Sequence, residues 1–130
     1  VPLPPAALGG WLPAIADALD FTHARGFLHR DVKPANILFD DHGTARLGDF
    51  GVVKAVAALT DPGAGPVTQT GSAPGTFPYM PLEVLAGRAA DGRADQFALG
   101  VTVYEVLAGR NPYHGMTPEQ RLFLLYEPAQ

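Results

Sequence analysis

One segment in the second half of the sequence limits the folds that this chain can adopt. Residues 95–108 carry apolar side chains that would point in nearly every direction around a helix. These side chains are Phe97, Leu99, Val101, Val103, Tyr104, Val106 and Leu107. A helix that is apolar on all sides has to be surrounded by other elements. We therefore expect a central buried helix that ends at Gly109, because glycine readily adopts the left-handed conformation that terminates helices.

Two further helices are predicted on either side of this central one. Apolar residues at helical spacing predict a helix over 8–24, in which Pro13 favours a start near Gly10. Residues 1–5 are rich in proline and favour an extended lead-in. Near the other end, the sequence Thr-Pro-Glu-Gln at 117–120 is typical of a helix start, with a capping residue followed by proline. This last helix is expected to run to about residue 126.

The remaining elements are expected to be short. Strands are predicted at 27–28, 37–39 and 45–47, and the sequence Asp-Asp-His-Gly at 40–43 indicates that the last two form a hairpin. The two aspartates of this turn are interpreted as turn-forming residues. A short helix is expected at 79–86. Residues 57–78 hold many Gly, Pro, Thr and Ser residues, which predicts a long mobile loop.

Composition excludes several classes of function. The chain has 130 residues, which is enough for one domain with a modest core. The net charge is −4 and the nine Lys and Arg residues are dispersed, which argues against nucleic acid or an anionic membrane as the main partner. There is no cysteine, so the chain has no disulfide and no thiol nucleophile. Without a visible signal or spanning segment, a cytoplasmic location is expected.

The sequence HRDVKPAN at 29–36 is the strongest indication of chemistry. Asp31 could accept a hydroxyl proton, Lys33 could hold a phosphoryl oxygen, and Asn36 could hold a metal ion. Each residue alone has a structural explanation, such as a turn cap or a solvated side chain. Together, at this spacing, they favour phosphoryl transfer, in which positioning and charge neutralisation do most of the work.

Three further motifs follow in order. Asp49 begins the tripeptide Asp-Phe-Gly, and a carboxylate beside the Asn36 amide would make a set of hard oxygen ligands suited to Mg²⁺. Residues 75–83 read GTFPYMPLE, and residues 95–101 read DQFALGV. With these motifs, the chain resembles the large, C-terminal lobe of a eukaryotic-like Ser/Thr protein kinase over nearly its whole length. The resemblance implies an α+β fold, mainly α, with short hairpin strands and without the small lobe.

The resemblance also implies roles for individual residues around ATP and Mg²⁺. Asp31 would be the catalytic base that orients the substrate hydroxyl, and Lys33 would contact the transferring phosphate. Asn36 and Asp49 would hold Mg²⁺, and Leu38 would pack under the adenine ring. Together these residues would transfer the γ-phosphate of ATP to Ser or Thr residues of protein substrates.

Other residues would position the loop and the substrate. The resemblance implies that Thr76 bonds to Asp31 and Lys33, and that Asp95 fastens the catalytic loop through its backbone amides. Residues 52–78 would form the activation-loop region. Arg30 would pair with a phosphorylated residue of that region. The candidates for this residue are Thr68, Thr70 and Ser72.

The sequence departs from the family pattern in two ways. The family's Ala-Pro-Glu is replaced by Pro-Leu-Glu at 81–83, and the arginine that usually pairs with Glu83 would lie beyond Gln130. The small lobe should supply a Gly-rich loop, a strand lysine and a helix glutamate. The only lysines here are Lys33 and Lys54, and no glutamate precedes Glu83. The isolated chain is therefore expected to be poorly active without the missing N-terminal lobe as its partner.

Two alternatives to an enzyme of this class remain at the level of sequence. One is a pseudokinase-like or truncated regulatory module that docks partners without catalysis. The other is a small-molecule phosphotransferase with a related catalytic loop, which ranks last because such enzymes lack the 75–83 and 95–101 motifs. His23, His42 and His114 are interpreted as surface or packing residues, and His29 as a residue that packs the catalytic loop.

Overall fold

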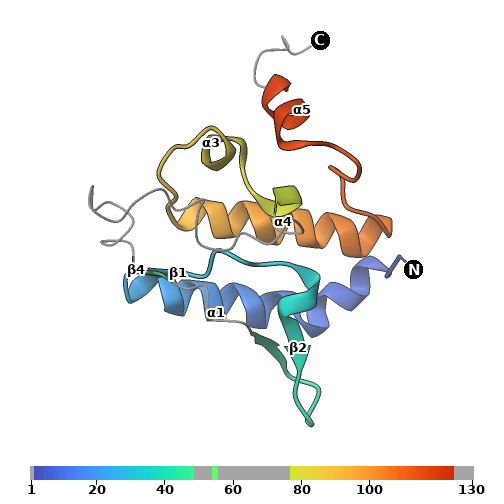
Figure 1. Cartoon of the computed structure of the whole chain (residues 1–130). Helices are drawn as coiled ribbons and strands as arrows, with labels where there is room; N and C mark the ends of the chain where they lie inside the picture. Colours follow the sequence, from blue (N-terminus) through green and yellow to red (C-terminus); the bar gives the residue numbers. More distant parts are fainter. Residues whose placement is uncertain (1, 49–53, 56–76, 125–130) are drawn as a thin grey trace.

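In the part of the chain that the structure describes, the fold is mainly helical, with two small antiparallel sheets of two strands each. The computed structural model describes residues 2–48, 54–55 and 77–124. Its α-helices and strands are α1 (Leu12–Ala24), β1 (Phe27–Leu28), β2 (Ile37–Phe39), β3 (Ala45–Leu47), β4 (Lys54–Ala55), α3 (Leu82–Leu85), α4 (Gly92–Ala108) and α5 (Pro118–Phe123). Three short 3₁₀ helices lie at η1 (Pro5–Gly10), η2 (Pro34–Asn36) and η5 (Phe77–Tyr79). Figure 1 shows α4 across the middle of the molecule, α1 beneath it, and the chain from β1 to η2 between the two helices.

The central helix is confirmed, with one change at its start and one at its surface. It begins at Gly92 rather than at residue 95, because the Asp91 carboxylate caps it by accepting a hydrogen bond from the Arg93 backbone N–H at 2.9 Å. It ends, as predicted, at Gly109, whose φ of 82° is left-handed. Burial on all sides is wrong: of the seven apolar side chains named for this helix, Val101 is buried, five are half-buried and Tyr104 is 48% exposed.

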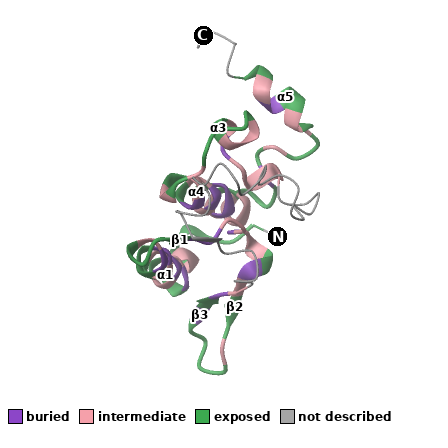
Figure 2. Ribbon diagram, turned by 60° about the vertical axis from the view of Figure 1, so that its left-hand side comes forward, coloured by how far each residue is buried: buried purple, intermediate pink, exposed green. Residues whose placement is uncertain are grey.

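The first helix packs under the central one and supplies much of the core. A 3₁₀ turn, η1, occupies residues that were expected to be helical or extended, and α1 begins at Leu12. Pro13 is tolerated because it lies in the first turn, where its missing N–H has no intrahelical partner to lose. Ile15 and Leu19 are buried and pack in one cluster with Val32 and Ala98. Figure 2 shows this buried side of α1 facing the rest of the molecule.

The predicted hairpin is confirmed, and a second sheet joins it. Strands β2 and β3 pair antiparallel with Ile37 opposite Leu47. The Asp40 carboxylate accepts hydrogen bonds from the backbone N–H groups of His42 and Thr44, each at 2.9 Å, and the bond from Thr44 is the main cause that lowers the pKa of Asp40. Strand β1 pairs with β4, a partner that local sequence patterns did not predict.

The chain after residue 76 differs in detail from the expectation. The short helix predicted at 79–86 is divided into η5 and α3, because Pro81 lies in the extended conformation between them. The start of α5 is confirmed with its capping box: Thr117 Oγ1 accepts from the Gln120 backbone N–H, and the Gln120 side chain accepts from the Thr117 backbone N–H. Among the described residues, no helix has the length and apolar character needed to cross a membrane.

Candidate active site

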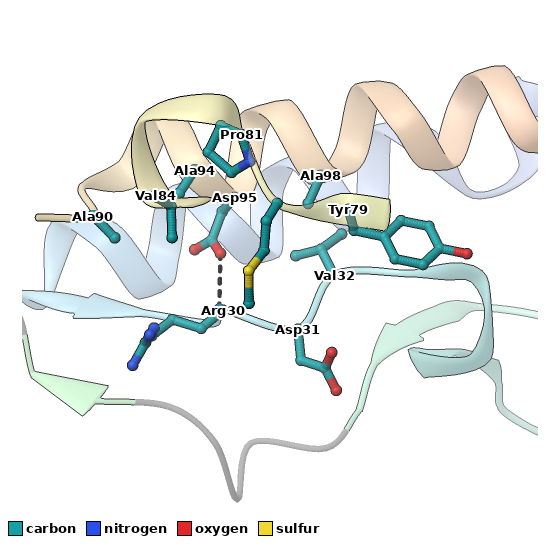
Figure 3. A pocket seen from close by; sticks show the side chains of 11 residues that line it. Arg30, Asp31, Val32, Tyr79, Pro81, Val84, Ala90, Ala94, Asp95 and Ala98 are labelled. Atoms are coloured by element: carbon teal, nitrogen blue, oxygen red, sulfur yellow. Dashed lines mark hydrogen bonds between the residues drawn. The ribbon is translucent and has the colours of Figure 1, made fainter. Parts of the chain in front are cut away.

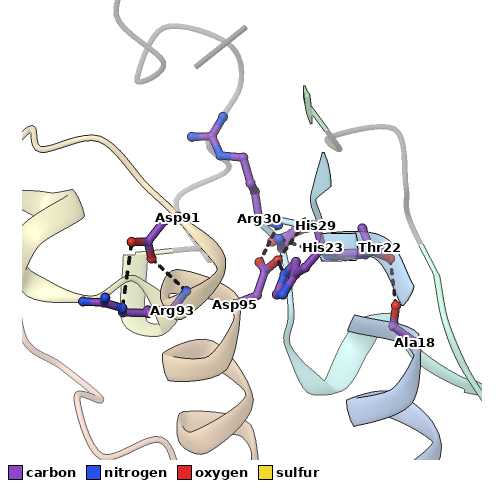
Figure 4. A network of polar contacts seen from close by, with 9 residues as sticks. Ala18, Thr22, His23, His29, Arg30, Asp91, Arg93 and Asp95 are labelled. Atoms are coloured by element: carbon purple, nitrogen blue, oxygen red, sulfur yellow. Dashed lines mark hydrogen bonds and ion pairs between the residues drawn. The ribbon is translucent and has the colours of Figure 1, made fainter. Parts of the chain in front are cut away.

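The loop at 29–36 is held against α4 by one buried carboxylate. Asp95 is 1% exposed, and its Oδ2 and Oδ1 accept hydrogen bonds from the backbone N–H groups of His29 and Arg30, each at 2.8 Å. The carboxylate Oδ2 also lies 2.7 Å from Nε2 of His23, which projects from α1. Figure 4 shows the Asp95 carboxylate between the His23 ring and the start of the loop. A buried charge is tolerated when hydrogen bonds surround it in this way.

The two amides can point at the same carboxylate because of the backbone at Arg30. This residue has a φ of 71°, the left-handed region that side chains other than glycine rarely adopt. Such a conformation stores strain of about 1–3 kcal/mol and persists only where surrounding contacts enforce it. The bonds to Asp95 supply that enforcement. Burial lowers the pKa of the Arg30 guanidinium and the nearby Asp95 charge opposes that effect, so the side chain remains a cation.

His29 joins the loop to the strand that leads toward Asp49. The His29 side chain is fully buried, and its Nε2 lies 2.7 Å from the carbonyl oxygen of Gly48. Its Nδ1 accepts a hydrogen bond from the Asp31 backbone N–H at 3.1 Å, which requires the proton to be on Nε2. The imidazole therefore fixes the position of Gly48 relative to Asp31.

Three of the expected catalytic side chains converge at the end of the loop. Nζ of Lys33 lies 3.5 Å from Oδ1 of Asp31, and Nδ2 of Asn36 donates to Oδ2 of Asp31 at 3.0 Å. Nδ2 of Asn36 also donates to the Asp31 backbone carbonyl at 2.7 Å. These contacts orient the Asp31 carboxylate from both sides, and Figure 3 shows it pointing away from α4.

Of the two expected magnesium ligands, the structure describes Asn36 alone, because Asp49 lies outside the described residues. Both hydrogen bonds from the Asn36 side chain to Asp31 use its NH₂ group, so its amide oxygen is oriented away from Asp31. Amide and carboxylate oxygens are the ligands that Mg²⁺ prefers. The Asn36 carbonyl accepts from the Gly48 backbone N–H at 2.7 Å, which brings the residue before Asp49 next to Asn36.

A pocket opens between the loop at 29–36, the chain at 79–90 and the first half of α4. It is lined by Arg30, Asp31, Val32, Tyr79, Met80, Pro81, Val84, Ala90, Ala94, Asp95 and Ala98. Tyr79 is anchored to the central helix because its hydroxyl donates to Oε2 of Glu105 at 2.6 Å. Burial, with the Glu105 carboxylate as the next cause, raises the pKa of Tyr79 to about 12. Figure 3 shows Tyr79 and Pro81 on the α4 side and Asp31 on the loop side of this pocket.

Several expected site residues lie elsewhere. Leu38 is 55% exposed on β2, so its side chain is open to a ligand. Glu83 is exposed at the start of α3 and forms no ion pair within the part of the chain that the structure describes. Outside the described residues are Asp49, Thr68, Thr70, Ser72, Thr76 and most of the 52–78 region.

Sequence reasoning missed two residues that hold the site together. His23 was interpreted as a surface or packing residue, and this is wrong because its ring contacts the buried Asp95 carboxylate. Arg121 on α5 was not singled out, although it is 1% exposed and donates to two backbone carbonyls beside the pocket. No spacing pattern marks a single polar residue, so neither role could be found from the sequence.

The sequence matches the protein kinase domain family over residues 2–126, and the chain belongs to this family. It is 42% identical to the serine/threonine-protein kinase PknL of Mycobacterium tuberculosis over 114 residues, which cover 88% of this chain and 27% of the relative. It is 38% identical to the serine/threonine-protein kinase PknB of Mycobacterium leprae over 117 residues, 90% of this chain and 18% of the relative. The chain thus spans about a quarter or less of the length of these curated relatives. Protein kinases generally use ATP and Mg²⁺ and act on proteins.

The Tyr79–Glu105 contact predicts a pH dependence of stability. The pKa of Tyr79 is about 12 in the folded chain against 10.0 for a free phenol. The neutral phenol therefore stabilises the fold fully below about pH 10, and this contribution is lost as the pH rises through about 12. We expect Tyr79→Phe to lower the free energy of unfolding by about 1–2 kcal/mol at pH 7. Denaturant titrations should show that the difference in free energy of unfolding between Tyr79→Phe and the unsubstituted chain shrinks between these two pH values. The control is Tyr104→Phe, at an exposed position, for which this difference should be small and constant. A Tyr79→Phe difference that stays constant across this range would contradict the assignment.

Proposed function

We propose that this chain is the large, helical lobe of a protein serine/threonine kinase that transfers the γ-phosphate of ATP to Ser or Thr residues of protein substrates. The observation that carries the proposal is the convergence of Lys33 and Asn36 on the Asp31 carboxylate, in a loop held by the buried Asp95. Family membership and the names of the relatives agree with this reaction. The lobe assignment rests on the order of the motifs within residues 1–130.

In the proposed reaction, Asp31 accepts the proton of the substrate hydroxyl as that oxygen attacks the γ-phosphorus. The bond from the γ-phosphorus to the bridging oxygen breaks, and ADP leaves with that electron pair. Its Oδ2 is held by Asn36, and its Oδ1 is near the Lys33 ammonium. Lys33 is 3.5 Å from Asp31 and so can contact a phosphoryl oxygen next to the attacking hydroxyl. Mg²⁺, held by the Asn36 amide oxygen and by Asp49, would neutralise charge on the phosphates of ATP.

The remaining roles are proposed from the motif positions. Leu38 would pack under the adenine ring, and its exposure is compatible with that role. Thr76 would bond to Asp31 and Lys33, and Glu83 would pair with an arginine of a later helix. Arg30 would form an ion pair with a phosphorylated side chain of the 52–78 activation-loop region. The candidate sites of that phosphorylation are Thr68, Thr70 and Ser72. The half-buried Arg30 guanidinium is a cation, as that pairing requires.

Phosphoryl transfer from radiolabelled ATP tests the proposal directly. The complete protein that contains this chain should label serine and threonine of a generic protein substrate when Mg²⁺ is present. The 130-residue chain alone should be poorly active, because no Gly-rich loop or lysine–glutamate pair to clamp the phosphates is found in its sequence. Absence of labelling by the complete protein would overturn the kinase assignment. Ordinary kinase rates from the isolated chain would overturn the dependence on a second lobe.

A further inference from the structure

Arg121 is the largest fully buried side chain among the described residues, and it projects from the short helix α5. Its two terminal nitrogens, Nη1 and Nη2, donate to the backbone carbonyls of Phe77 and Met80, each at 2.5 Å. The two carbonyls are at either end of the same turn, in which the Met80 backbone N–H also donates to the Phe77 carbonyl at 3.2 Å. One guanidinium therefore spans and closes the turn. We call residues 77–81 the wall segment, because part of it lines the pocket beside the 29–36 loop.

The chemistry of this contact needs an arginine. In the described part of the chain Arg121 has no carboxylate partner. Two aromatic rings lie against its guanidinium carbon: the centroid of Tyr113 at 4.0 Å and that of Phe97 at 6.0 Å. Burial lowers the pKa of Arg121 and Tyr113 opposes this, but a guanidinium keeps its proton in proteins. A buried cation is costly unless its donors are used. Both terminal nitrogens of Arg121 are used, whereas its buried Nε has no hydrogen-bond partner among the described residues. The planar fork of arginine reaches two acceptors at once, which a lysine cannot do with the same geometry.

The wall segment that Arg121 holds faces the catalytic loop. Tyr79, Met80 and Pro81 line the same pocket as Arg30 and Asp31. The far side of the segment is fixed by the hydrogen bond from Tyr79 to Glu105 of α4. The segment thus has two anchors, one on the central helix and one on α5. Without the α5 anchor, the carbonyls of Phe77 and Met80 lose their bonds to Arg121, while the hydrogen bond from Tyr79 to Glu105 remains.

We propose that Arg121 is a positioning residue for the protein substrate: by clamping the wall segment it sets the distance between that segment and Asp31, and so governs how the phosphate-accepting chain is held. This inference rests on the proposed kinase function for its kinetic consequence. The clamp itself does not depend on that function. Arg121 touches no reacting group, so its effect is on substrate binding and not on the proton transfer at Asp31.

Amide hydrogen exchange of the complete protein tests the clamp independently of activity. Arg121→Met keeps the apolar stem and removes the fork. Backbone amides of residues 77–86 should exchange at least about tenfold faster in this variant, while amides of α1 keep their rate. Arg93→Met, which removes a cation that is 86% exposed on α4, should leave both regions unchanged. Unchanged exchange at 77–86, or equal acceleration in α1, would overturn the clamp.

Steady-state kinetics with myelin basic protein as the phosphate acceptor test the consequence. Arg121→Met should raise KM for that protein by about fivefold or more, with kcat and the KM for ATP within about twofold. Arg121→Lys should give an intermediate KM, because one ammonium can reach only part of the fork's partners. A lower kcat with unchanged KM would overturn substrate positioning. If the unsubstituted protein transfers no phosphate, the kinase proposal fails, and hydrogen exchange still decides the clamp.

Discussion

Replacing Asp31 with asparagine is expected to lower kcat of the complete kinase by about 10²- to 10⁴-fold, the usual contribution of a general base. Asparagine has the same shape and can still accept the hydrogen bond that Asn36 Nδ2 makes to the Asp31 side chain. It cannot take the proton of the substrate hydroxyl. The loop should therefore keep its structure while the chemical step slows, and the KM for ATP should change little.

Initial rates at saturating Mg·ATP and protein substrate measure this effect. Asp41→Asn is the matched control, because it makes the same chemical change at an exposed position in the β2–β3 turn. The control should retain full activity. If Asp31→Asn kept more than about a tenth of kcat, a catalytic base at this position would be ruled out.

Replacing Asp95 with asparagine is expected to destabilise the fold by about 3–5 kcal/mol, because it breaks a buried, hydrogen-bonded charge. One carboxylate oxygen would become an NH₂ group that faces other donors. Oδ1 accepts from the Arg30 backbone N–H, and Oδ2 accepts from the His29 backbone N–H and lies against His23. Either orientation of the amide leaves a buried N–H without an acceptor. The left-handed backbone of Arg30 would lose its support at the same time.

Denaturant unfolding followed by circular dichroism measures the loss. The control is Asp91→Asn on the same helix, where the side chain caps the helix and is exposed to water. Asparagine caps helices about as well as aspartate, so this control should change stability by less than about 0.5 kcal/mol. A similar small effect for both variants would show that the Asp95 carboxylate is not what holds the loop.

The parts of the fold that sequence predicted are those determined by nearby residues. The β2–β3 hairpin follows from turn chemistry within a few residues of Asp40, and the start of α5 follows from the Thr117–Gln120 capping box. The pairing of β1 with β4 joins segments about 27 residues apart, and a two-residue strand carries no periodicity from which to predict a partner. The early start of α4 was missed because Asp91 was not recognised as its cap.

In the candidate site, too, the features formed by nearby residues were predicted and those formed by distant contacts were not. Asp31, Lys33 and Asn36 were identified because they are close together in one motif, and the structure places their side chains within hydrogen-bonding or ion-pairing reach. His23 and Arg121 contribute through contacts with residues 72 and 41 to 44 positions away, respectively. Tertiary packing alone determines which backbone carbonyl a single arginine reaches. Such supporting residues become visible only when the chain is folded.

The position of Asp95 has a consequence for how the site forms. Its three partners precede it by 72, 66 and 65 residues, so the loop at 29–36 receives its anchor only after α4 has docked on α1. Contacts of such long range form only when the long intervening loop has closed, which costs conformational entropy. The geometry of the proposed catalytic residues is therefore not determined by the sequence at 29–36 alone. A nascent chain released from the ribosome before α4 would hold every residue of that motif without its working conformation.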